Sequence, residues 1–364
     1  MLPKAGEIVC DIRPEAGNPR NSEGAFLDLR DGRLLFAYSK FYGETHSDTA
    51  KAGISARYSS DQGSTWSDDE WLVMPEEHDA RNIMSVSLLR MKNGDIGMFY
   101  LIRYGFQNMR LHIRRSPDEG KSWGEAICCV PGTGYYVTNN DRVVRLSGGR
   151  LIIPAAYHKM QTEDGAHWSA FDRRGVVHFF LSDDDGRTWR EASGACAMPA
   201  PRAKRGLLEP GLVELKSGVL WAWARTDIGC QYEMFSYDGG ETWSIPAPSV
   251  FTSPDSPLSM KRLPQGQLLA VWNPIPNYMS RAYAKHTVGR TPLIGAISAD
   301  DGKTWDRYFA LEREAEDQGG YCYTAIHAAD DDSLLLAYCA GEAEDASCLS
   351  RLRIRKIKLA DLVQ

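Results

Sequence analysis

Polar side chains recur at one place in a repeated strand–turn–strand pattern of this 364-residue sequence. They lie where the strand before each turn begins, nine to thirteen residues ahead of the turn, and they are Arg20, Arg81 to Ser85, Asn139-Asn140, Glu209, Asp255-Ser256 and Tyr323. A guanidinium group can hold an anion, and carboxyl and phenol groups can exchange protons. An Arg, a Glu and a Tyr in one register therefore predict a chemical site rather than a core. The alternative is that these strands begin at a wet surface, where polar residues are ordinary.

The strand–turn–strand pattern itself occurs six times. Its clearest copy is 25–37, where two apolar segments flank Asp31-Gly32. The corresponding turns in the other copies are Asn93-Gly94, Gly148-Gly149, Ser217-Gly218, Gln265-Gly266 and Asp332-Ser333. The flanking residues alternate between apolar and polar, which is typical of hairpin strands. We therefore expect six β-hairpins.

A second repeat follows five of these hairpins and has the sequence Ser-x-Asp-x-Gly-x-Ser/Thr-Trp. Its copies span 59–66, 116–123, 182–189, 236–243 and 298–305, so their starts are 57, 66, 54 and 62 residues apart. The Asp can accept hydrogen bonds from the turn's own amides, the Gly can supply a positive φ, and the Trp can pack beneath the turn. One such octapeptide would be weak evidence, but five at nearly constant spacing indicate a repeated structural unit.

The two interleaved repeats predict an all-β fold, a six-bladed β-propeller that forms one domain over residues 1–364. Each unit of about 60 residues is long enough for four strands. The sixth unit lacks the Trp turn, and we expect its outer part to close the ring. The C-terminal run 352–359 would pair with the N-terminal run 7–12 for this purpose.

Charge and composition restrict the partners. The net charge of -6 and the pI of about 5.8 argue against nucleic acid or an anionic membrane as the main partner. No run approaches the ~18 apolar residues of a membrane-spanning helix, and no secretory signal is visible. The eight cysteines include no Cys-x-x-Cys pair and are expected to be free thiols. We expect a cytoplasmic protein, although a secreted chain with its signal removed would read the same.

The octapeptides resemble the Asp boxes of the sialidase (neuraminidase) superfamily, and the residues between them resemble a bacterial sialidase over essentially the whole chain. Asp boxes indicate the fold only, because they also occur in propellers without glycosidase activity. The resemblance of the intervening residues implies a retaining exo-glycoside hydrolase that releases a terminal α-linked sialic acid or related nonulosonic acid. It implies no cofactor and no metal, and a carbohydrate partner that ends in an acidic sugar.

Residue by residue, the resemblance implies a clamp of three arginines for the sugar carboxylate. Arg20 would be the first, Arg225 in Trp-Ala-Arg-Thr the second, and Arg290 in Gly-Arg-Thr-Pro the third. Arg81 and Asn140, which open two other inner strands, would be further substrate-binding residues.

The resemblance also implies the catalytic residues. Tyr323 would be the nucleophile, Glu209 the base that activates it, and Asp48 the acid/base for the leaving oxygen. Tyr321 competes with Tyr323, which we favour because the following Thr-x-x-Ile matches the family pattern.

Two departures from the family pattern affect these expectations. The first arginine stands in Asn-Pro-Arg-Asn rather than in Arg-Ile-Pro, and residues 37–41 lack the Glu and Arg that commonly follow the first hairpin. Glu44 and His46 share the loop of the acid/base, so either could be the titrating group instead. His158 is expected to be a structural histidine. A propeller glycosidase for a different terminal sugar, and a non-catalytic propeller that binds carbohydrate or protein, remain the alternatives.

Overall fold

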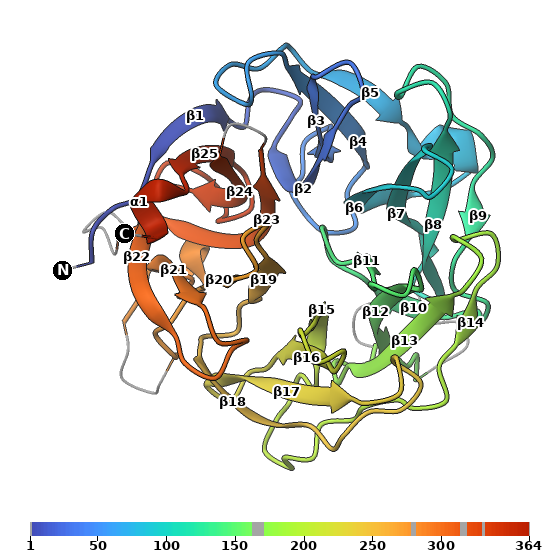
Figure 1. The fold of residues 1–364 in the computed structure, drawn as a ribbon. Helices are drawn as coiled ribbons and strands as arrows, with labels where there is room; N and C mark the ends of the chain where they lie inside the picture. The colour runs from blue at the N-terminus through green and yellow to red at the C-terminus, as the bar shows by residue number, and fades with distance from the viewer. Residues whose placement is uncertain (1, 162–170, 278–281, 314–318, 330–331, 364) are drawn as a thin grey trace.

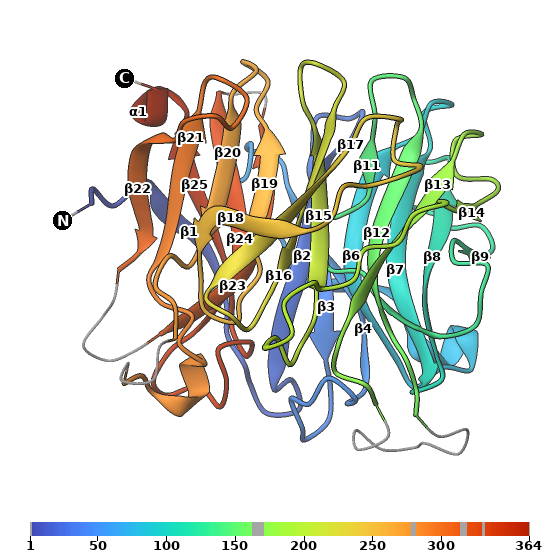
Figure 2. The same cartoon turned by 90° about the horizontal axis from the view of Figure 1, so that it is seen from below.

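The computed structural model describes residues 2–161, 171–277, 282–313, 319–329 and 332–363, and strands dominate them. Figure 1 shows the sheets arranged around a central axis, with β2, β6, β15, β19 and β23 nearest to it. Viewed at right angles, the strands run between the two faces of the ring, where loops connect them (Figure 2). The predicted all-β class is confirmed, and the arrangement fits a β-propeller.

The described strands form five hydrogen-bonded sheets. The first contains β2 (Arg20–Asp28), β3 (Leu34–Phe41), β4 (Ala52–Ser59) and β5 (Glu70–Val73). A nine-stranded sheet contains β6 (Asn82–Arg90), β7 (Ile96–Gly105), β8 (Asn108–Ser116), β9 (Ile127–Cys128), β10 (Tyr135–Val137), β11 (Val144–Arg145), β12 (Leu151–His158), β13 (Val176–Ser182) and β14 (Arg190–Glu191). One parallel pair, Tyr135 with Met109, joins its β10 to its β8.

The remaining three sheets have four strands each. One contains β15 (Leu208–Glu214), β16 (Leu220–Arg225), β17 (Cys230–Ser236) and β18 (Ala247–Thr252). The next contains β19 (Ser259–Arg262), β20 (Leu268–Trp272), β21 (Leu293–Ser298) and β22 (Asp306–Glu312). The last contains β23 (Gly320–Ala328), β24 (Ser333–Gly341), β25 (Leu352–Lys358) and β1 (Glu7–Ile12). The described helices are short: η1 (Pro75–His78), η3 (Lys285–Thr287) and α1 (Ala360–Val363).

The octapeptide turns have the predicted hydrogen bonds. In the first copy, Asp61 Oδ1 accepts the backbone N–H of Thr65 at 2.8 Å, and Ser59 Oγ accepts that of Gly63 at 2.8 Å. Gly63 has a φ of 83°, and Nε1 of Trp66 donates to its carbonyl at 3.1 Å. These contacts join residues three or four positions apart, so the local sequence is sufficient to specify them.

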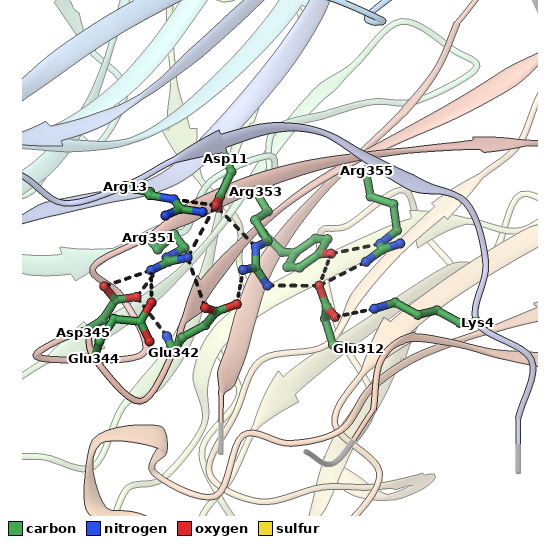
Figure 3. Close-up of polar contacts among 11 residues, drawn as sticks. Lys4, Asp11, Arg13, Glu312, Glu342, Glu344, Asp345, Arg351, Arg353 and Arg355 are labelled. Atoms are coloured by element: carbon green, nitrogen blue, oxygen red, sulfur yellow. Dashed lines mark hydrogen bonds and ion pairs between the residues drawn. The ribbon is translucent and has the colours of Figure 1, made fainter. Parts of the chain in front are cut away.

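The predicted pairing of the chain ends is also present. β1 runs antiparallel to β25, and Ile12 lies opposite Leu352. A cluster of ion pairs strengthens this junction (Figure 3). In it, Arg353 contacts both Asp11 of β1, at 3.2 Å, and Glu312 of β22, at 3.4 Å. The cluster therefore ties β25 to the N-terminal strand and to the neighbouring sheet.

Four inner strands carry a β-bulge at the same register. The bulged residues are Glu23, Ser85, Glu209 and Tyr323, and each interrupts the pairing of its strand with the next. Their φ values are 59°, 60°, 47° and 56°, and each lies nine residues before the positive-φ residue of its hairpin turn. A positive φ is uncommon outside glycine, and a bulge redirects the side chain that it carries. The repeat thus aims one side chain from each of these strands in an equivalent direction.

The eight cysteines are free thiols, as predicted. No helix in the described part of the chain is long and apolar enough to cross a membrane.

Candidate active site

A cavity of about 320 Å³ lies where the bulged strands meet, and all four bulged side chains line it. Its other polar lining residues include Arg20, Asp48, Arg103, Asn139 and Arg205. Its apolar lining includes Met84, Leu101, Met109, Val137, Phe171 and Leu208. The cavity can therefore hold a ligand that has both charged and apolar substituents.

Tyr323 and Glu209 are in direct contact at this cavity. The phenolic oxygen of Tyr323 donates a hydrogen bond of 2.7 Å to Oε1 of Glu209. Burial, and then the charge of Glu209, raise the pKa of Tyr323 well above its usual value, against the opposing effect of Arg290 and Arg225. Within the described residues, Oε2 of Glu209 has no hydrogen-bond partner although it is buried. The pair has the geometry of a nucleophile and its base.

Arg225 binds the same oxygen of Glu209 as Tyr323 does. Its Nη1 donates to Oε1 of Glu209 at 2.7 Å, and its Nε donates to Oδ1 of Asp255 at 2.5 Å. Burial alone would lower the pKa of Arg225, but these two carboxylates raise it above its usual range. Burial would likewise raise the pKa of Asp255, but Arg225 outweighs it and brings that pKa to about 2. Both partners of Arg225 are therefore fixed in their orientation.

Arg290 lies over the ring of Tyr323, with its guanidinium carbon 5.4 Å from the ring centroid. Its Nη1 contacts Sγ of Cys322 at 3.1 Å, and its Nε donates to the backbone oxygen of Asp255 at 3.3 Å. In these contacts its guanidinium nitrogens meet neutral acceptors, so it keeps a net positive charge beside the phenol.

Arg20 is fully buried at the start of β2 and stacks on Phe41, with 4.2 Å between its guanidinium carbon and the ring centroid. Its Nη1 donates to Oδ1 of Asp48 at 2.5 Å, and its Nη2 lies 3.5 Å from Oε2 of Glu23. Burial would lower the pKa of Arg20, but Asp48 and then Glu23 raise it. Two carboxyl groups therefore compete with any anionic ligand for this cation.

Asp48 is the residue of its loop that lines the cavity, and 52% of its side chain is exposed. The backbone oxygen of its neighbour His46 accepts a further bond from Arg20, and the backbone oxygen of Asp48 accepts one from Arg103. Partial desolvation would raise the pKa of Asp48, but Arg20, Arg103 and Arg290 hold it below its usual value. Asp48 is therefore an ionised partner of arginines.

Of the five predicted substrate-binding residues, only Arg20 lines the cavity: Arg225 and Arg290 are buried beside Glu209 and Tyr323, and the other two are placed elsewhere. Arg81 is exposed and outside the cavity lining: it lies four residues before the bulge of β6, whereas Arg20 lies three residues before that of β2, and it pairs through its backbone with Arg103. Asn140 is buried, and its Nδ2 donates to the backbone oxygens of Gly24 at 2.8 Å and of Tyr323 at 3.3 Å. Asn140 thus fixes the backbone of two inner strands, and the cavity has Arg103 as a cation where we expected Arg81.

The competing candidates separate clearly. Tyr321 is buried and packs against Tyr338 in the core, whereas Tyr323 lines the cavity. His158 also lines the cavity, but its Nδ1 is bonded to the backbone oxygen of Asp172 at 3.0 Å, and burial lowers its pKa to about 4. Among the described residues, no group of three or more His, Cys, Asp or Glu side chains could hold a metal ion.

A model of the BNR repeat-like domain matches residues 32–336. The chain belongs to this family. This places it among BNR-repeat proteins with sialidase relatives, as the Asp boxes and intervening residues predicted. The matched residues include the five octapeptides and three of the four bulged residues that line the cavity. The fourth, Glu23, lies before the matched range.

Two curated relatives of this BNR repeat-like chain are sialidases by name. An anhydrosialidase of Macrobdella decora is 29% identical over 163 residues, which are 41% of this chain and 18% of that protein. Sialidase-4 of Homo sapiens is 28% identical over 187 residues, which are 48% of this chain and 36% of that protein. The matches thus span well under half the length of either relative.

Solved structures show the fold of the family more completely. A Hadza microbial sialidase has a TM-score of 0.71 at 18% identity, over 95% of this chain and 67% of that chain. A leech intramolecular trans-sialidase bound to 2,7-anhydro-Neu5Ac has a TM-score of 0.70 at 16% identity, over 98% and 70%. A protein of unknown function from Dyadobacter fermentans scores 0.70 at 17%, over 96% and 99%. At these identities the likeness establishes a sialidase-like fold.

Among the charged residues of the cavity lining, sequence reasoning missed Glu23, Arg103, Arg173 and Arg205. Glu23 lies nine residues before Gly32, the same offset that Glu209 has from Gly218, so the repeat itself carried the signal. Arg103 lies near the end of β7, the second strand of its hairpin, and an inspection limited to inner strands could not find it.

Proposed function

We propose that this chain is a retaining exo-glycoside hydrolase that releases a terminal α-linked sialic acid, or a related nonulosonic acid, from glycoconjugates. The bond of 2.7 Å between Tyr323 and Glu209 at a cavity bordered by arginines is the observation that supports this most. We further propose that the ring has six blades, with the nine-stranded sheet counted as two that share one parallel pair.

The chemistry of a sialoside explains why a phenol suits this position. The sugar carries a carboxylate on its anomeric carbon, so a carboxylate nucleophile would approach against like charge, whereas a neutral phenol avoids this repulsion. A phenol is a weak nucleophile at its usual pKa near 10 and needs a base beside it. Glu209 would take the proton as Tyr323 attacks, as in the sialidase exception among retaining glycosidases.

The arginines would bind the substrate carboxylate. Arg290 and Arg225 border Tyr323, and guanidinium groups bind carboxylates through paired, charge-assisted hydrogen bonds. Leaving-group departure requires a carboxylic acid as well. The family resemblance implies Asp48 for that step, and its Oδ1 is bonded to Arg20.

A different terminal sugar is the second candidate, and the first hairpin provides the observation in its favour. Lys40 stands just after the first hairpin, where the family commonly has a Glu and an Arg in the sugar pocket. It forms an ion pair with Asp69, and neither residue lines the cavity. Glu23 adds a carboxyl group beside Arg20. The ring substituents that this cavity accepts would then differ from those of sialic acid.

A panel of fluorogenic glycosides separates these proposals. Release from the α-sialoside, with ¹H NMR showing the α-anomer as first product, supports the main proposal. Free sugar and a 2,7-anhydro product would be distinguished in the same spectra. Turnover of another glycoside alone supports the second candidate. If no glycoside is cleaved and Tyr323→Phe changes no measured binding property, the chain is a non-catalytic propeller.

A further inference from the structure

A second cavity, of about 350 Å³, lies at the other end of the inner strands. The candidate active site is lined by the first halves of β6 and β15, whereas the second cavity is lined by the second halves of these two strands together with β11 and β19. Figure 1 places β6, β15 and β19 around the central axis. The two cavities therefore lie toward opposite ends of the same strands, and the proposed function gives the second cavity no role.

Arg142 is a buried cation in the lining of the second cavity. Only 4% of its surface is exposed, and its Nη2 donates to the backbone oxygen of Leu258 at 2.6 Å. Among the described residues, no carboxylate forms an ion pair with Arg142, and its buried Nε has no hydrogen-bond acceptor. A buried charge is costly unless it is paired and its donors are satisfied. The second cavity therefore contains a charged donor that the described part of the chain leaves unsatisfied.

The other three basic side chains of this lining each have a carboxylate partner. The pairs, with distances of 2.6 or 2.7 Å, are Lys261 with Asp141, Arg145 with Asp185, and Arg262 with Asp301. The second carboxylate of the lining, Glu214, accepts the backbone N–H of Ser147 at 2.6 Å and its Oγ–H at 2.7 Å. The basic side chain of the lining that is left for an incoming anion is thus that of Arg142.

The surroundings of Arg142 hold its guanidinium group in place. The group lies over the ring of Trp223, 5.7 Å from the ring centroid, and Nε1 of Trp223 donates to the same oxygen of Leu258 at 2.9 Å. A Cβ at Gly211 would lie 2.5 Å from the ring of Trp223 and 2.9 Å from Nη1 of Arg142, so glycine is required for this close approach. The apolar remainder of the lining consists of Leu89, Val143, Val144, Leu212, Val213 and Met260. A matching ligand therefore has one negative charge and an apolar body.

We propose that the second cavity binds a small organic monocarboxylate, with its carboxylate on Arg142 and its apolar part against the side chains of β11, β15 and β19. A carboxylate matches the planar donors of a guanidinium group and supplies a single negative charge. The second charge of a dianion such as phosphate would be repelled by Asp141 and Glu214 in the same lining. Burial lowers the pKa of Arg142 to about 10, while Asp141, Glu209 and Tyr323 raise it, so the group is charged at neutral pH.

NMR of protein labelled with ¹³C at the methionine methyl groups tests the site, with butyrate as the probe and butyramide as its neutral analogue. Met260 lines the second cavity, whereas Met84 and Met109 line the candidate active site, so their resonances report which cavity is occupied. The variant Met260→Leu assigns the first resonance. We expect butyrate to shift the Met260 resonance saturably and butyramide to bind ~10-fold or more weakly. No shift of Met260, a shift confined to Met84 or Met109, or equal binding of the two probes would overturn the proposal.

Two variants act on the second cavity in different ways. Arg142→Met should weaken butyrate binding by ~10–100-fold, because it removes a charged hydrogen-bond donor. Val144→Trp keeps Arg142 but fills the cavity from its wall, so it should abolish the Met260 shift even if Arg142→Met fails to fold. The exposed control Lys121→Met should bind butyrate as the wild type does.

Unchanged butyrate binding in Arg142→Met or in Val144→Trp would contradict the proposal. Displacement of butyrate by an equal concentration of chloride would also contradict it, because the cavity would then be a site for an inorganic ion. Each of these measurements is of binding and needs no turnover. The result therefore does not depend on whether the chain cleaves a glycoside at Tyr323.

Discussion

The phenolic oxygen of Tyr323 and Oε1 of Glu209 are 2.7 Å apart, although 114 positions separate the two residues in the chain. Both residues occupy β-bulges with a positive φ, one in β23 and one in β15. The same type of β-bulge, present in both inner strands, thus brings the two side chains together. Strain of this kind is tolerated where the surrounding structure fixes it, as Arg225 and Asn140 do here.

Arg225→Lys should impair both stability and catalysis. Arg225 binds Glu209 and Asp255 at once, and a single ammonium cannot reproduce this fork. We expect the loss of about 2–3 kcal/mol of unfolding free energy, because one buried carboxylate loses its charged partner. Urea denaturation monitored by tryptophan fluorescence measures this. A Lys variant as stable as the wild type would show that the two contacts carry little energy.

Glu23→Gln should increase the stability of the protein at high pH. The folded-state pKa of Glu23 is about 7, raised by burial from an ordinary value of 4.5. A raised pKa contributes stability that is complete below about 4.5 and is lost as the pH rises to about 7. The difference in unfolding free energy, variant minus wild type, should therefore grow by about 3 kcal/mol between pH 4.5 and 8. A difference that is flat with pH would contradict the raised pKa.

The octapeptide aspartates should make the fold sensitive to acid. Desolvation raises the pKa of all five aspartates and is the largest single effect on Asp61, Asp184 and Asp238, but hydrogen bonds from Ser and Thr side chains and turn amides outweigh it and bring each pKa to about 2, against an ordinary 3.8. A lowered pKa contributes stability above about 3.8 that is lost as the pH falls to about 2. We expect Tm to fall steeply between pH 4 and 2, and less steeply in Asp184→Asn. The exposed control Asp68→Asn should keep the wild-type slope.

Glu312→Gln should weaken the junction of the chain ends. Oε1 of Glu312 accepts from Tyr338 at 2.8 Å and from Arg355 at 3.1 Å, and its Oε2 pairs with Lys4 (Figure 3). Removing this charge leaves the buried Arg355 without its carboxylate partner among the described residues, which costs about 3–5 kcal/mol. Calorimetry should show a much lower Tm. The matched control Glu344→Gln, whose side chain is 63% exposed, should leave Tm unchanged. Equal Tm values for both variants would refute a structural role for the cluster.

The fold was predictable because its signals are local. Each octapeptide satisfies its own turn within four residues, as Asp61 and Thr65 do, and the hairpin turns recur with a glycine or Asp332 at positive φ. The sixth unit lacks an octapeptide, so its outer part was expected to close the ring, and this predicted the pairing of β1 with β25. These features depend on short segments of sequence and on the number of repeats.

The site was predictable only in part, because side-chain direction depends on the bulges. Counting nine to thirteen residues back from each turn selected Arg20 and Arg81, but only the bulge register distinguishes the buried Arg20 from the exposed Arg81. Asn140 lies in the turn between β10 and β11, and its amide donates to the backbone oxygens of Gly24 and Tyr323. Arg103 reaches the cavity from a second strand, and no inner-strand pattern reveals such a residue.

Trapping the covalent intermediate tests the central claim, that Tyr323 is the nucleophile, most directly. A fluorinated sialosyl fluoride should form the sugar–enzyme bond quickly and hydrolyse it slowly, so that peptide mass spectrometry can locate the adduct. We expect a single sugar adduct on Tyr323 in the wild type and none in Tyr323→Phe, whose melting temperature should stay close to that of the wild type. An adduct on Glu209, Glu23 or Asp48, or an unchanged adduct in Tyr323→Phe, would contradict this account.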